Sequence, residues 1–129
     1  MRIGDLAAET GVSVRSLRYY EEQGLLAADR TPSGQRVYGA AALDRVQLVQ
    51  QLFGAGLPSR TIVQLLPCVD AGVSTPESFA LLVSERDRIS AQLAELEAAR
   101  DRLDDVIAIT EHPTAEHCPA LREPTVAAA

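Results

Sequence analysis

The fold of this chain is decided by the stretch Ser13-Val14-Arg15-Ser16-Leu17-Arg18-Tyr19-Tyr20-Glu21-Glu22-Gln23-Gly24-Leu25. Ser13 is a favoured helix N-cap, because its hydroxyl can accept a hydrogen bond from a free backbone N–H of the first turn. Gly24 suits the left-handed conformation that commonly closes a helix. Leu17 and Tyr20 are three residues apart, so Leu17 can face the interior. The stretch therefore predicts a short amphipathic helix.

The opposite face of this helix carries Arg15, Arg18 and Tyr19. Guanidinium groups bind phosphates well, and arginine can also bind base edges in the major groove of DNA. A solvated helix face with two arginines is also common, so the neighbouring segments have to decide between the two interpretations.

Both neighbouring segments favour DNA binding. Residues 3–12 predict another short helix that ends at Gly11, with Leu6 on its apolar side. Two short helices joined by a tight turn form a helix-turn-helix, whose second helix enters the groove. Downstream, Pro32, Ser33 and Gly34 predict the turn of a small β-hairpin, which Arg30 and Arg36 flank. The sequence thus predicts a winged helix-turn-helix.

The same segments carry a resemblance to a known family. The run 17–26, LRYYEEQGLL, followed by Gly34-Gln35-Arg36-Val37-Tyr38, resembles the MerR family of bacterial transcription regulators. Residues 56–62, GLPSRTI, are similar to the start of that family's fourth helix, and the resemblance covers about residues 1–110. One departure is Gln35, where the family often has a tyrosine before the wing arginine.

The pattern and the resemblance together define an expected DNA-binding surface. For Arg60, a solvated side chain is the alternative. The expected DNA-binding residues are Ser13, Arg15, Ser16, Arg18, Tyr19, Tyr20, Arg36, Tyr38 and Arg60.

The charge of the chain is unevenly distributed. The formal net charge is −6, which by itself argues against a nucleic-acid partner. Residues 1–60, however, hold seven arginines and six acids, whereas residues 61–129 hold five arginines and twelve acids. The first half can therefore bind DNA if its positive field is local.

The remaining helices are predicted from apolar spacing. Residues 40–53 form a supporting helix, and a further helix starts near Pro58 and ends at Pro67. A long helix follows from about Pro76 to Ile109, capped by Ser74 or Thr75. Its apolar residues at seven-residue intervals are Leu82, Ile89, Leu96 and Leu103.

Such a stripe with a charged exterior predicts a coiled coil that a second copy covers. The alternative is a helix folded back on its own domain. The MerR resemblance implies an antiparallel coil. The expected organisation is a winged helix-turn-helix head at 1–70, a linker at 71–75, a dimerisation helix at 76–110, and a tail at 111–129 with a candidate effector loop.

The sequence shows no nucleotide-binding loop, HExxH motif or Ser–His–acid set, so we do not expect an enzyme. Candidate metal ligands are Cys68, His112, His117 and Cys118. Metal-sensing relatives have two cysteines bounding the tail loop, and here His112 stands near the first of these positions. A thiol or metal response is one hypothesis, and an incidental cysteine in a loose tail is the other. A metal ion or small effector is the candidate cofactor.

The predicted fold class is mainly α, and the predicted function is transcription regulation. By resemblance, a homodimer binds a pseudo-palindromic promoter, distorts an overlong spacer and so acts on RNA polymerase. No segment resembles a signal peptide or a membrane span, so we expect a cytoplasmic protein. The competing hypothesis is a coiled-coil adaptor whose head binds another protein.

Overall fold

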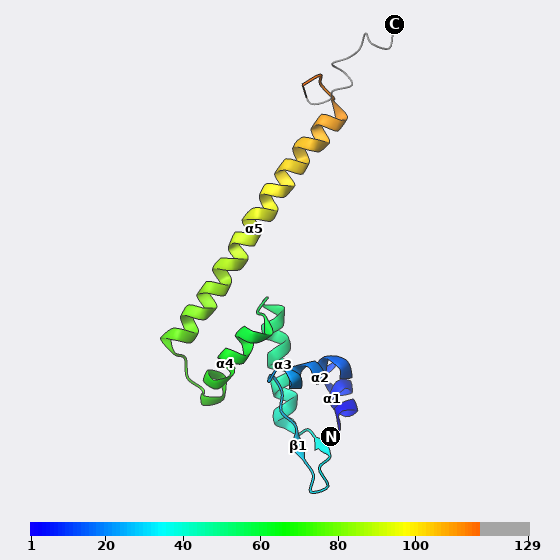
Figure 1. Ribbon diagram of the computed structural model, residues 1–129, viewed down its shortest axis with the longest axis vertical. Coiled ribbons are helices and arrows are strands. Elements are labelled where there is room, and N and C mark those ends of the chain that lie inside the picture. The colour runs from blue at the N-terminus through cyan, green and yellow to red at the C-terminus, as the bar shows by residue number, and fades with distance from the viewer. Residues whose placement is uncertain (117–129) are drawn as a thin grey trace. The chain divides into compact units, whose positions relative to one another are not determined.

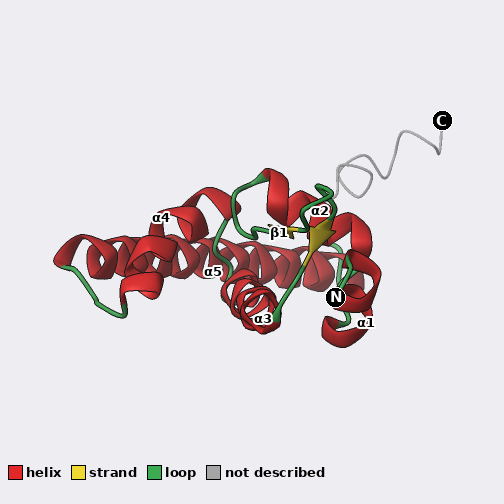
Figure 2. Ribbon diagram, turned by 90° about the horizontal axis from the view of Figure 1, so that it is seen from below, coloured by secondary structure: helices red, strands yellow, loops and turns green. Residues whose placement is uncertain are grey.

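The computed structural model of this chain describes residues 1–116, which form mainly helices (Figures 1 and 2). The elements in chain order are α1 (Ile3–Thr10), α2 (Val14–Glu22), β1 (Asp29–Arg30), β2 (Arg36–Val37), α3 (Ala40–Gly54), α4 (Ser59–Ala71) and α5 (Pro76–Glu111). The chain divides into two compact units, Met1–Glu85 and Arg86–Ala129. We call the first unit the head. The predicted fold class is confirmed: a helix-turn-helix head with a small hairpin, and a long C-terminal helix.

Helix α2 begins and ends where the sequence indicated. The Ser13 hydroxyl accepts a hydrogen bond from the backbone N–H of Ser16 at 3.1 Å. At the other end, Gly24 has a φ of +77°, and the Leu25 N–H donates to the carbonyl of Tyr20 at 2.8 Å. Only glycine adopts such a positive φ without strain, which explains the residue at this position.

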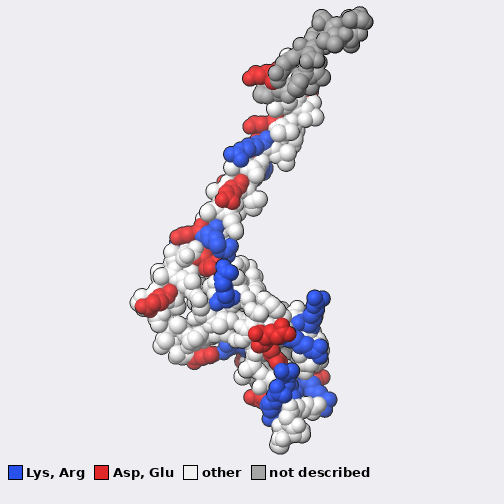
Figure 3. All heavy atoms as spheres, in the orientation of Figure 1, with Lys and Arg blue, Asp and Glu red and all other residues white. Residues whose placement is uncertain are grey.

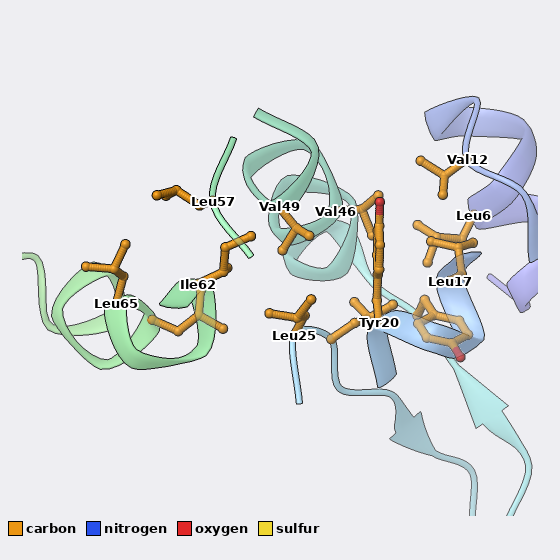
Figure 4. Close-up of a cluster of buried hydrophobic side chains, with 13 residues drawn as sticks. Leu6, Val12, Leu17, Tyr20, Leu25, Val46, Val49, Leu57, Ile62 and Leu65 are labelled. Atoms are coloured by element: carbon orange, nitrogen blue, oxygen red, sulfur yellow. The ribbon is translucent and has the colours of Figure 1, made fainter. Parts of the chain in front are cut away.

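One hydrophobic cluster holds the head together. Leu6 of α1 and Leu17 of α2 lie on one side of it, Ile62 and Leu65 of α4 lie on the other, and residues of α3 lie between them (Figure 4). Leu6, Leu17 and Ile62 have no exposed surface at all. Burying side chains of this size stabilises the fold by about 1.5–3 kcal/mol each. Helices α1, α2 and α4 are thereby fixed around α3.

Helix α4 differs from the prediction, because Pro67 does not end it. The helix continues to Ala71, and Gly72, with a φ of +68°, caps it. Proline removes one backbone donor and strains the preceding turn. Leu65 and Leu66, immediately before Pro67, are buried in the core, and the cap at Gly72 satisfies the carbonyls of Cys68 and Val69. Packing and capping thus outweigh the local cost of the proline.

Helix α5 begins at a reciprocal cap made by Thr75 and Ser78. Each backbone N–H donates to the other residue's hydroxyl, at 3.0 and 3.1 Å. The first ten residues of α5 belong to the head: Leu81 packs on the core, and the Thr61 hydroxyl donates to Glu85 at 3.2 Å. The head thus extends to Glu85, whereas the sequence placed its boundary in the loop before Pro76.

Among the residues that the structure describes, no side chain of α5 is fully buried. The predicted stripe residues Leu82, Leu96 and Leu103 are 44%, 68% and 58% exposed, and Ile89 is partly exposed. Within residues 1–116, no helix combines the length and the hydropathy needed to cross a membrane.

The hairpin is attached to the helices through Tyr38, which directly follows β2. The strands pair antiparallel, with Asp29 opposite Val37 and Arg30 opposite Arg36. The backbone N–H of Tyr38 donates to the carbonyl of Met1 at 2.7 Å, and its ring is buried in the core. Its hydroxyl donates to the Glu21 carboxylate on α2. Burial, then this hydrogen bond and the negative charge of Glu21, raise the pKa of Tyr38 to about 12.

We predict that Tyr38→Phe reduces the loss of stability at alkaline pH. The folded-state pKa lies above the ordinary value of 10.0, so the neutral phenol contributes stability that is complete below pH 10.0 and is lost as the pH rises towards 12. The sequence contains no lysine, so few other groups titrate in this range. For one site, wild type should lose on the order of 1 kcal/mol more stability than Tyr38→Phe between about pH 9 and about pH 11. Urea unfolding at both pH values and one protein concentration measures this, and equal losses in the two proteins would contradict it.

Candidate nucleic-acid interface

The outward face of α2 carries three side chains that suit DNA. Arg15, Arg18 and Tyr19 are exposed, whereas Leu17 and Tyr20 on the other face are buried. The two faces follow from the helical period, which turns residues 15, 18 and 19 away from residues 17 and 20. The predicted orientation of Leu17 and of the two arginines is therefore confirmed.

Two residues of the expected DNA-binding set lie in the core instead of on the surface. Tyr20 is 9% exposed, and its ring stacks on Phe53 of α3 at a centroid distance of 5.7 Å. Burial raises the pKa of Tyr20. Tyr38 is 2% exposed and donates to Glu21. The prediction that these two side chains face DNA is corrected, because aromatic rings of this size gain more from burial in the core than from a solvated surface.

Ser13 and Ser16 stand at the N-terminal end of α2. Their hydroxyls are hydrogen-bonded to each other at 3.0 Å, and Ser13 also caps the helix. Ser13 is exposed and Ser16 is partly exposed. Each therefore combines a structural hydrogen bond with a position at the end of the exposed face.

Arg36 on the hairpin is held by an acid of α2. Its Nε lies 3.3 Å from Oε2 of Glu21, and the arginine side chain is still 57% exposed while that of Glu21 is 16% exposed. Glu21 thus binds both Arg36 and Tyr38, and joins the hairpin to α2. The guanidinium is oriented by this ion pair, and most of its surface remains open to a further anion.

The start of α4 lies beside the exposed face of α2. The Tyr19 hydroxyl is 3.4 Å from that of Ser59, and the Ser59 hydroxyl is 3.4 Å from the side-chain oxygen of Gln23. Arg60 follows Ser59 in the first turn of α4 and is exposed. Arg60 is therefore the chain neighbour of a residue that contacts Tyr19, and its place in the DNA-binding set stays a prediction.

Two further arginines stand at the hairpin, outside the predicted DNA-binding set. Arg2 donates from Nη2 to the side-chain oxygen of Gln35 at 3.1 Å, and Arg30 donates from Nη1 to the carbonyl of Gly34 at 2.8 Å. Gln35, which departs from the family pattern, thus has a partner 33 positions away. The position of Arg30 beside the predicted turn of the hairpin could have identified it. Nothing in the local sequence indicates that Arg2 contacts the hairpin.

The arginines gather on one part of the head. In Figure 3 the blue side chains lie over α1, α2 and the hairpin, with a few acids among them. Such a cluster of arginines is the arrangement that a local positive field would need. Cations at this density suit a phosphate backbone.

The candidate metal ligands are not brought together within the described residues. Cys68 is partly exposed at the end of α4, and its Sγ lies 3.9 Å from the hydroxyl of Thr75. His112 is exposed just after α5. Within residues 1–116, no three side chains of His, Cys, Asp or Glu form a group that could hold a metal ion. His117 and Cys118 lie outside the described residues.

Comparisons with known proteins agree with this geometry. Residues 1–67 match the model of the MerR HTH family regulatory protein. Nodulation protein NolA of Bradyrhizobium elkanii is 38% identical over 106 residues, which are 81% of this chain and 46% of NolA. This chain thus spans less than half the length of that relative. The HTH-type transcriptional regulator ZntR of Escherichia coli is 31% identical over 117 residues, 86% of this chain and 83% of ZntR.

Two solved structures extend the similarity over nearly the whole chain. The lead(II) complex of the transcription regulator PbrR691 from Ralstonia metallidurans has a TM-score of 0.76 at 26% identity, covering 95% of this chain and 97% of that one. HiNmlR, a MerR family regulator bound to promoter DNA, has a TM-score of 0.57 at 25% identity, covering 99% and 98%. With the family model matching more than half of its residues, this chain belongs to the MerR HTH family of regulatory proteins.

Proposed function

We propose that this protein is a homodimeric transcription regulator that binds a pseudo-palindromic promoter site. The observation that carries the proposal is the exposed face of α2, with Arg15, Arg18 and Tyr19 beside a hairpin rich in arginine. The similar HiNmlR is a family regulator bound to promoter DNA. Regulators of this family are non-enzymatic, and an action on promoters would take place in the cytoplasm.

In this proposal α2 enters the major groove and the hairpin lies along the phosphate backbone. Arg15 and Arg18 would contact bases and phosphates, with Tyr19, Ser13 and Ser16 beside them, and Arg36 would contact the backbone. Arg60 would contact the flanking phosphates from α4. Tyr20 and Tyr38 would not contact DNA directly. They would hold α2 and the hairpin in their relative positions.

The dimer would set the distance between two such heads. Helix α5 has 36 residues, about 54 Å at the usual rise of about 1.5 Å per residue. Its apolar stripe is exposed in the single chain, and a second copy with the same stripe would cover it. Two-fold symmetry of the protein would then match an inverted repeat in the DNA.

By family resemblance, binding would bend and untwist a promoter whose spacer is too long. The realigned promoter elements would then be recognised by RNA polymerase. Deformation of this kind costs on the order of 1–6 kcal/mol, which the arginine contacts of two heads would have to offset.

The first test concerns Arg18. We predict that Arg18→Ala weakens binding to a duplex selected by the wild-type protein from a random pool by about 1–3 kcal/mol, because one specific contact is lost. The melting temperature should stay nearly unchanged, because the side chain is exposed. Arg102→Ala, on the exposed surface of α5, is the matched control and should bind like wild type. Gel-shift titration measures both, and an unaltered affinity for Arg18→Ala would refute the assignment.

The DNA sequences selected from the random pool also test the alternative function, a coiled-coil adaptor whose head binds another protein. A DNA-binding regulator should enrich an inverted repeat and lose affinity steeply as salt rises. A coiled-coil adaptor should enrich no motif and show little dependence on salt.

The second test concerns the stripe. We predict that Leu96→Asp gives a monomer and abolishes binding to the inverted repeat, because truncating a buried leucine alone costs roughly 2–5 kcal/mol and a buried charge adds to that cost. Ala94→Asp is the matched control, because residue 94 lies on the other side of the helix from residue 96. Sedimentation velocity distinguishes the two forms. A Leu96→Asp protein that remains a dimer would show that the stripe packs elsewhere.

A further inference from the structure

Arg2 stands at the N-cap of α1, a position that ordinarily suits other residues. Its backbone is extended there, and its side chain makes no capping hydrogen bond. Serine, threonine, aspartate and asparagine cap helices because their oxygens accept from the first free N–H groups, whereas a guanidinium only donates. A positive charge at this end also opposes the helix dipole. Arginine is thus a poor start for α1, and the contacts of its side chain lie outside the helix.

The backbone beside Arg2 is fixed against the hairpin. The Tyr38 N–H donates to the Met1 carbonyl at 2.7 Å, and the Met1 nitrogen donates to the Tyr38 carbonyl at 2.8 Å. Residues directly opposite each other in antiparallel strands exchange bonds in this way. The Arg2 N–H donates to Oδ2 of Asp5 at 3.1 Å. Arg2 is therefore held next to β2 by main-chain contacts on both sides.

The Arg2 side chain reaches along the hairpin to Gln35. Its Nη2 donates to Oε1 of Gln35 at 3.1 Å. Gln35 is itself fixed, because its N–H donates to the Thr31 hydroxyl at 3.0 Å and its carbonyl accepts from the Thr31 N–H at 2.9 Å. Within residues 1–116, no carboxylate forms an ion pair with Arg2, which is exposed. Most of its five N–H donors therefore face solvent.

The tip of the hairpin, residues 31–35, receives a second guanidinium. Arg30 donates from Nη1 to the carbonyl of Gly34 at 2.8 Å, so the two arginines are bound to consecutive residues of the tip. The tip contains no aspartate or glutamate. Two cations beside a tip without an acid attract an anion, and the forked guanidinium matches the oxygens of a phosphate.

We propose that Arg2, positioned by Gln35, is a further DNA-binding residue that contacts a backbone phosphate beside the tip of the hairpin. The inference rests on the proposed function and adds a residue to its DNA-binding surface. Such a contact fixes the register of the protein on the duplex and does not read the base sequence. Gln35 is a positioning residue, which acts through Arg2.

The variant Arg2→Ser separates this role from a structural one. Serine is a favoured N-cap, so the melting temperature at one protein concentration should equal or exceed that of wild type. The affinity for the selected duplex should nevertheless fall, because one phosphate contact is lost from each head. A residue with a purely structural role would lose stability and affinity together.

The dependence on salt measures the lost contact. The slope of log K against log salt should become less steep by about 0.9 for each head, or by about 1.8 for two heads. The affinity ratio of wild type to Arg2→Ser should then shrink by about tenfold between about 50 mM and about 200 mM salt. A duplex with both half-sites scrambled should be weakened by the same factor, because a phosphate contact is independent of sequence. Arg102→Ala removes the same charge from α5 and should keep the wild-type slope.

A double-mutant cycle tests the part played by Gln35. Gln35→Leu removes the acceptor and keeps a side chain of similar length. We expect it to weaken DNA binding in the wild-type background and to have no further effect in Arg2→Ser. An equal loss in both backgrounds would show that Gln35 does not act through Arg2, and would overturn its role as a positioning residue.

A wild-type salt slope for Arg2→Ser, under conditions in which Arg18→Ala weakens binding, would overturn the inference about Arg2. That result would leave the DNA-binding proposal intact. A wild-type protein that binds neither the selected nor the scrambled duplex would instead refute the proposed function itself.

Discussion

Burial of Leu17 and Tyr20 against the core fixes which way α2 presents its other face. Leu17 has no exposed surface, and the Tyr20 ring stacks on Phe53 of α3. These contacts leave the helix no freedom to rotate about its axis, so Arg15 and Arg18 point to solvent. A nine-residue helix is too short to be stable alone. The orientation of the candidate DNA-binding surface is therefore a consequence of core packing.

Glu21 connects this packed helix to the hairpin. One carboxylate accepts the hydroxyl hydrogen of Tyr38 and pairs with Arg36. Arg36 begins β2 and Tyr38 follows it, in a hairpin with only two residues in each strand. So short a ladder has little stability of its own. The negative charge of Glu21 also lowers the net positive charge beside α2, which would weaken the attraction of the head to DNA phosphates. The contacts of the same carboxylate fix the position of the hairpin. Fixed geometry matters more for specific recognition than total charge does.

The sequence predicted the elements whose signals are local. Ser13 and Gly24 bounded α2 correctly, and the period of Leu17 distinguished its two faces. Three features needed tertiary information. Pro67 lies within α4, because the buried leucines before it and the cap after it outweigh a local cost. Tyr20 and Tyr38 carry groups that could equally serve a core or a phosphate, and only the folded core, in which both rings lie, decides between them. The contact between Arg2 and Gln35 joins residues that are close only after the chain has folded.

The central claim is that two heads, held apart by their own coil, bind one DNA site together. Its most direct test compares a selected inverted repeat with a duplex that keeps one half-site and scrambles the other, by sedimentation with labelled DNA at fixed salt. The account predicts two chains on the full site, and a loss of affinity of at least about tenfold, or about 1.4 kcal/mol, on the half-site duplex. A single chain bound to either duplex with equal affinity would contradict it.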